Sequence, residues 1–100
     1  MTYNLAFVES ALKEWRNLTP QLREQLKDKL RERLENPHVI SARLHGLADC
    51  YKIKLRSAGY RLVYQVNDKA VIVTVIAVGK RDKGLVYLAA NKRIKDARTA

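Results

Sequence analysis

The sequence predicts an α+β domain of element order βααβββα, in which two N-terminal helices pack on a small, mostly antiparallel sheet and a third helix ends the chain. Two helical patterns follow one short strand pattern, and three strand patterns then succeed one another across short turns. In addition, 47% of the 100 residues are hydrophobic, enough for a real core. We therefore expect residues 1–100 to form a single domain whose last few residues are a basic tail.

The first three expected elements are one strand and two helices. Residues 3–8 alternate loosely between polar and apolar side chains, as a strand does, and residues 9–18 carry apolar side chains at helical spacing. Thr19 and Pro20 are a typical start for a second helix, because a capping oxygen is followed by proline at the first helical position. This helix carries a core-facing stripe and ends at Asn36-Pro37; the stripe is made of Leu22, Leu26, Leu30 and Leu34.

A connector, three strands and a helix are expected in the second half. The connector covers residues 38–49, and two strands, residues 51–56 and 60–67, join through a short hairpin loop. Residues 70–78 are apolar on both faces and rich in β-branched side chains, which is typical of a central strand that Gly79 would end. A last helix over residues 85–97 carries a basic fringe, which binds RNA or is a solvated helix end.

Positive charge is concentrated in the second half of the chain. Residues 1–42 contain seven Lys and Arg against six Asp and Glu, whereas residues 43–100 contain thirteen against four. This asymmetry favours an anionic partner, with nucleic acid as the first candidate. The alternative is that the charge has no binding role and only makes a basic protein more soluble.

Several classes of protein are disfavoured. The first ten residues lack a signal-peptide pattern, and the longest apolar run, residues 70–78, is too short to cross a membrane. We therefore expect a cytoplasmic location. The single cysteine, Cys50, excludes an internal disulfide and more readily packs than reacts, and no Cys/His spacing typical of metal sites exists. We expect neither a metal nor another cofactor.

A row of cations marks the hairpin. Residues 50–67 contain no carboxylate, yet Lys52, Lys54 and Arg56 lie two residues apart and so point to one face of a strand. On the next strand Arg61 falls on the same face, while the tyrosines at positions 60 and 64 fall on the core or rim side. Cations without counter-charges repel one another, and phosphate would relieve that repulsion.

Four segments resemble the RelE toxins of bacterial toxin–antitoxin pairs, in order and without a gap to about residue 95. They are ALKEW at 11–15, REQLKDKL at 23–30, DCYKIKLRSAGYRLVYQV at 49–66 and VIAVGKR at 75–81. The resemblance implies a fold shared with microbial ribonucleases and an endoribonuclease that cuts messenger RNA in the ribosomal A site. It also implies partners, namely the ribosome, mRNA and a neutralising RelB-like antitoxin.

Cleavage by attack of the 2′-hydroxyl needs a base, a stabiliser of the phosphorane and help for the leaving 5′ oxygen. With no carboxylate on the basic face, that chemistry has to use Lys, Arg and Tyr. Neighbouring cations, namely Lys52, Arg61 and Arg81, could lower the pKa of Lys54 enough for it to act as a base. By resemblance, Lys54 is the base, Lys52 and Arg61 stabilise the phosphate, Arg81 lies nearest the leaving oxygen, and Tyr87 stacks on the substrate base.

Four further residues are candidates for RNA contacts only: His45, Arg56, Lys80 and Lys83. Most of them have an alternative interpretation. Arg56 near the turn is equally well a solvated charge, Lys80 can simply end a strand, and His45 can be an ordinary loop residue. The loop from Asp82 to Gly84 departs most from the RelE pattern.

Two other functions stay open. One is a ParE-like toxin, which shares the fold, poisons DNA gyrase and generally lacks the Lys/Arg/Tyr set. The other is a non-catalytic module that binds RNA or the ribosome, because the same cations would bind phosphate in either case.

Overall fold

The computed structural model describes residues 2–82 and 84–99, and the side chains of these as far as residue 96. Its elements confirm the α+β class and the expected order, with one short 3-10 helix, η1, added in the connector. They are β1 (Asn4–Phe7), α1 (Glu9–Arg16), α2 (Pro20–Glu35), η1 (Ile40–Ala42), β2 (Cys50–Leu55), β3 (Tyr60–Asn67), β4 (Ile72–Lys80) and α3 (Leu85–Thr99).

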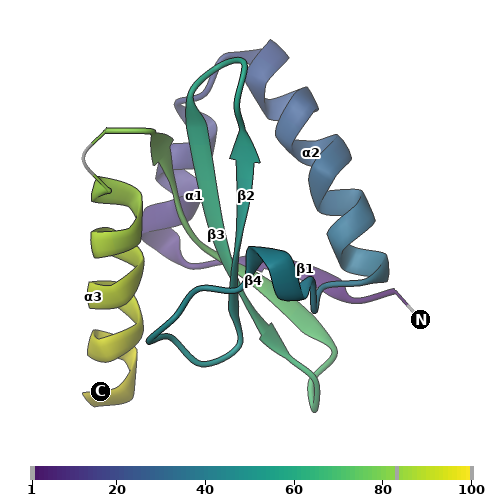
Figure 1. Ribbon diagram of the computed structural model, residues 1–100, viewed down its shortest axis with the longest axis vertical. Helices are drawn as coiled ribbons and strands as arrows, with labels where there is room; N and C mark the ends of the chain where they lie inside the picture. Colours follow the sequence, from purple (N-terminus) through teal and green to yellow (C-terminus); the bar gives the residue numbers. More distant parts are fainter. Residues whose placement is uncertain (1, 83, 100) are drawn as a thin grey trace.

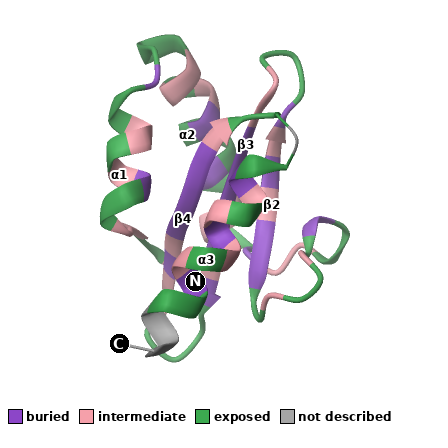
Figure 2. Cartoon of the chain, turned by 90° about the vertical axis from the view of Figure 1, so that its left-hand side faces the viewer, coloured by how far each residue is buried: buried purple, intermediate pink, exposed green. Residues whose placement is uncertain are grey.

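The four strands form one mixed sheet of order β1-β4-β3-β2. β1 runs parallel to β4, and the other two pairings are antiparallel. β4 is central, as its apolar pattern predicts. Figure 1 shows α2 and α3 on opposite sides of the sheet, and Figure 2 shows the strands buried between helices whose outer faces are exposed. β2 is therefore an edge strand, with α2 packed on one of its faces.

Two apolar clusters fill the space on the two faces of the sheet. The first joins α1 and α2 to the sheet through residues such as Ala11, Leu26 and Leu30, which confirms the core-facing leucine stripe. The second joins α3 to the other face through Val86, Ala90 and Ile94. Burial of this apolar surface is the main stabilising contribution to the fold.

Local signals explain where α2 begins. The Thr19 hydroxyl accepts a hydrogen bond from the Leu22 backbone N–H at 3.3 Å, and Pro20 occupies the first turn. The predicted cap is confirmed. None of the helices in the described part of the chain is long and apolar enough to cross a membrane.

The expectation that Gly79 ends the central strand is wrong. β4 continues to Lys80, and Gly79 pairs with Arg61 of β3. A Cβ at position 79 would lie 3.0 Å from Cγ2 of Val86 on α3, so the glycine allows the helix to approach the strand closely. The strand also begins later than expected, at Ile72, because Val71 completes the turn with a φ of 57°.

An ion pair links α1 to α3 where β4 extends beyond β1. Arg93 of α3 donates to both carboxylate oxygens of Glu14 on α1, at 2.8 and 3.1 Å, and also to the Ile76 carbonyl at 2.8 Å. Glu14 in turn accepts from the Val78 N–H at 3.1 Å. These bonds satisfy the Ile76 carbonyl and the Val78 N–H of β4, which lie beyond the last residue of β1 that pairs with this strand. They also hold α3 against the sheet.

Candidate functional site

The structure brings the predicted cations of the hairpin to one face of the sheet. Lys52 and Lys54 project from β2, and Lys54 is paired directly with Arg61 of β3. Ile53 and Leu55 are buried in the core on the opposite face. Strand parity therefore predicted the faces correctly, and we define Lys52, Lys54 and Arg61 as the cationic face.

Arg61 lies deepest of these three cations. Its residue is 7% exposed, which makes it the one buried charged residue among those whose burial is described. Its Nη1 donates to the Tyr60 carbonyl at 3.0 Å. A guanidinium held this way has lost much of its hydration without gaining a carboxylate partner, which costs folding free energy. That cost falls when an anion binds.

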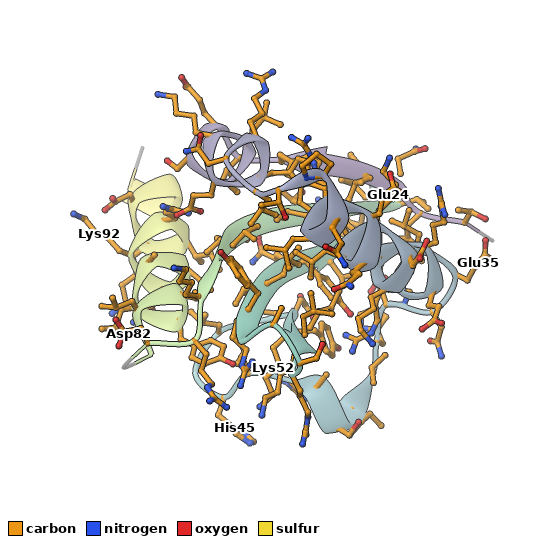
Figure 3. All side chains as sticks on the ribbon, turned by 90° about the horizontal axis from the view of Figure 1, so that it is seen from above. Glu24, Glu35, His45, Lys52, Asp82 and Lys92 are labelled. Atoms are coloured by element: carbon orange, nitrogen blue, oxygen red, sulfur yellow. The ribbon has the colours of Figure 1, made fainter. Side chains whose placement is uncertain are left out.

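The ion pairs within the described residues lie elsewhere. None of them includes a member of the cationic face or Arg56; they join acidic and basic side chains of the helices, or His38 and Asp68. Figure 3 shows Lys52 and His45 on one side of the molecule, whereas Glu24 and Glu35 lie on α2 and the third labelled carboxylate, Asp82, lies after the end of β4. The cationic face is thus open to an anionic ligand from outside.

The amine of Lys54 is tuned by its surroundings. Its pKa is lowered from the usual lysine value, first by the positive charge of Lys52, then by partial burial, and then by Arg56 and Arg61. Each neighbouring cation disfavours the protonated form. The sequence-based expectation named Arg81 instead of Arg56; Arg81 lies beyond the end of β4 and is not among the causes. Lys54 is accordingly the best base of the cationic face.

Arg81 and Tyr87 come from the segment that follows β4, and separate contacts hold each of them near the cationic face. The Arg81 backbone N–H donates to the carbonyl of Gly59 in the β2–β3 turn, which ties the segment after β4 to the tip of the hairpin. The Arg81 side chain is exposed. Tyr87, in the first turn of α3, is half-buried and packs against the cluster that contains Cys50 and Val63. Both lie beside the strands that carry the cations.

A residue missed by sequence reasoning supports the edge strand from behind. Arg33 of α2 donates to the Lys52 carbonyl at 3.0 Å and to the Tyr64 hydroxyl at 2.9 Å. The Tyr64 hydroxyl passes a hydrogen bond on to the Pro37 carbonyl at 2.8 Å. Helical spacing could have identified this residue. Arg33 follows Leu26 by seven residues, which is about two turns, so it lies on the core-facing side of the helix. β2 is thereby fixed at the residue that carries Lys52.

The remaining candidates lie at the margins of the cationic face. His45 and Arg56 are exposed in a loop and a turn, and Lys80 is exposed at the end of β4. Lys83 lies outside the described residues. The RNA contacts of all four stay predictions.

His38 lies on the other face of the sheet from the cationic face, beside Tyr51. Its ring nitrogens bond to the Tyr51 hydroxyl at 2.7 Å and to the Asp68 carboxylate at 2.9 and 3.1 Å. Asp68 follows β3, whereas Arg61 lies near its start, so about 24 Å of strand separates them at about 3.4 Å per residue. Within the described residues no group of three or more potential metal ligands gathers anywhere.

The chain is similar to known toxins. A family model described as "ParE toxin of type II toxin-antitoxin system, parDE" matches residues 5–84. An Escherichia coli protein named "mRNA interferase toxin RelE" is 61% identical over 94 residues, which are 94% of this chain and 99% of the relative.

Two solved structures of E. coli RelE are also similar. A double mutant of the toxin in the free state has a TM-score of 0.87 at 60% identity, covering 94% of this chain and 99% of that one. The intact E. coli RelBE toxin–antitoxin complex contains a chain with a TM-score of 0.78 at 60% identity, covering 81% of this chain and 99% of that one.

Proposed function

Because the chain belongs to the RelE/ParE family of toxins, we propose that it is a RelE-type mRNA interferase, the toxin of a type II toxin–antitoxin pair. It cleaves mRNA in the ribosomal A site and thereby halts translation. The observation that carries this proposal is the cationic face without counter-charges, in a chain 61% identical to a RelE toxin over nearly its whole length. Such a face binds the phosphate backbone.

The chemistry follows from the placement of the three cations. Neutral Lys54 takes the proton of a ribose 2′-hydroxyl, and the 2′ oxygen forms a bond to phosphorus. As the bond to the 5′ oxygen breaks, a 2′,3′-cyclic phosphate and a 5′-hydroxyl end result. Arg61, paired with Lys54, and Lys52 stabilise the extra negative charge on the phosphorane. The lowered pKa of Lys54 increases the fraction of the neutral amine that can act as a base at a given pH.

Arg81 and Tyr87 act on either side of the reacting bond. Arg81 stabilises negative charge on the leaving 5′ oxygen, which takes its proton from water, because a guanidinium hardly releases a proton. Tyr87 stacks on a substrate base and orients the nucleotide. The hydrogen bond from the Arg81 N–H to the tip of the hairpin supports the first role, and the packing of Tyr87 against the apolar cluster supports the second.

The partners follow from the same surface. In the cytoplasm, where the ribosome and mRNA are found, a RelB-like antitoxin neutralises the toxin, as the E. coli RelBE complex illustrates for the relative. An antitoxin segment that brings carboxylates to the cationic face would also relieve its repulsion. The gyrase-poisoning alternative is disfavoured, because the chain is 61% identical to an mRNA interferase toxin over 94 residues and contains all five proposed catalytic residues.

Inducing the chain in growing cells is expected to produce new mRNA 5′ ends inside translated codons. Arg81→Ala or Tyr87→Ala should remove most of these ends and restore growth, because each substitution removes a group that contacts the reacting nucleotide. The matched control is Arg56→Ala, which removes one exposed charge and should act far more weakly. Sequencing of mRNA ends measures this. Intact transcripts in arrested cells would contradict the proposal.

A further inference from the structure

A cavity of about 400 Å³ lies between the connector and α3, beside Tyr87. Leu44 and Leu47 form one wall, and Tyr87 and Leu88 form the other. Two polar side chains, His45 and Asn91, complete the lining. This volume lies within the range of small-molecule pockets, about 300–1,000 Å³, and the lining combines apolar walls with few polar groups, as such pockets do.

The cavity continues the cationic face without a break in the sheet surface. Leu44, Leu47 and Tyr87 pack against an apolar cluster that includes Cys50 and Val63. Cys50 lies two residues before Lys52 on β2, and Val63 lies two residues after Arg61 on β3, so all four point to the same face. A chain whose phosphate lies on the cations therefore has the cavity within reach of its neighbouring base.

We propose that this cavity binds one nucleobase of the RNA next to the cleaved bond and that Asn91 determines which base is preferred there. The inference rests on the proposed ribonuclease function and adds its base specificity. A nucleobase fits the lining, because its faces are apolar and stack on aromatic rings while its edges carry donors and acceptors. The adjoining cations select a ligand with a phosphate backbone over an uncharged one.

The amide of Asn91 can read the edge of a base. An asparagine side chain donates and accepts at the same time, so an amide held in one orientation pairs bidentately with a base edge that presents a donor beside an acceptor in the matching order. Leu88 is 62% exposed and lies at the mouth of the cavity, where a base would enter. The cavity thus offers one base an apolar wall, an aromatic ring to stack on and, in Asn91, an amide that can hydrogen-bond to its edge.

Purified ribosomes carrying mRNA with a randomised A-site codon provide the test. Sequencing the cut ends gives the base preference at each position. The wild type should prefer one base at one position next to the cut by about fivefold or more, the discrimination expected of one bidentate pair. Asn91→Ala should reduce that preference below about twofold at this position only, with total cleavage within about threefold of wild type.

Two further variants keep the test decisive. Gln21→Ala removes an exposed helical amide on α2 and should leave every preference unchanged. Leu88→Trp fills the mouth of the cavity from an exposed position, so folding should tolerate it, and it should also flatten the preference at the same position. Unchanged preferences in both cavity variants, or equal loss of cutting at all codons, would overturn the inference. Failure of the wild type to cut would instead overturn the proposed function.

Discussion

Replacing Lys54 with methionine should lower the rate of mRNA cleavage on programmed ribosomes by about 10²–10⁴-fold, the usual contribution of a general base. Methionine keeps an unbranched side chain of similar length but cannot accept the 2′-hydroxyl proton. Lys54 lies within β2 opposite Arg61, so the rest of the cationic face should keep its arrangement. Single-turnover cleavage with saturating toxin measures the chemical step.

The control for this substitution is Lys69→Met. Lys69 is an exposed lysine in the turn between β3 and β4, at the far end of the hairpin, so its loss should change the cleavage rate little. If Lys54→Met binds ribosomes as tightly as wild type and still cuts within about threefold of its rate, Lys54 does not act as the base.

Replacing Arg61 with methionine should have two opposite effects. Cleavage should fall by about 10²–10³-fold, because a preorganised group that stabilises the phosphorane is lost. The free energy of unfolding should rise by about 1–3 kcal/mol, because a buried charge without an acidic partner is replaced by an apolar side chain of similar size. Urea unfolding followed by circular dichroism measures the second effect.

Arg33→Met is the matched comparison for this experiment. Arg33 is also a partly buried arginine, but its guanidinium donates to the Lys52 carbonyl and the Tyr64 hydroxyl. Its loss removes a donor from both groups, while the Tyr64 hydroxyl keeps its bond to the Pro37 carbonyl, so this variant should be destabilised by about 1–3 kcal/mol. A stability loss of similar size in Arg61→Met would show that Arg61 serves the fold, and that its burial is not a cost which anion binding relieves.

Strand parity made much of the site predictable. The alternation from Tyr51 to Leu55 separates core from cations, and the observed register places Arg61 opposite Lys54 on the face that the sequence allowed for it. The apolar pattern of residues 70–78 likewise identified the central strand, which begins at Ile72. These features depend on local periodicity, which a sequence shows directly.

Features that depend on tertiary contacts were not predictable in the same way. Gly79 looked like the end of a strand, yet it lies within β4 because Val86 of α3 needs the space of a side chain. Arg33 looked like an ordinary helical charge, yet it holds the carbonyl of Lys52 on a strand nineteen residues away. The cavity beside Tyr87 needs the connector and α3 together, and their approach is not encoded by either segment alone.

The cationic face works as a catalytic site because its charges tune one lysine. Neighbouring cations lower the pKa of Lys54, and Lys52 contributes most. A lysine base is active only when neutral, so the cleavage rate should rise with pH, about tenfold per pH unit below the pKa of Lys54, and then level off.

The most direct measurement is the pH dependence of single-turnover cleavage for the wild type and Lys52→Met. Removing the Lys52 charge should raise the pKa of Lys54 and shift the rising limb of the profile to higher pH, so that the loss of rate is large near neutral pH and smaller in alkaline buffer. A rising limb at the same pH in both proteins would show that the charges of the cationic face do not tune the base.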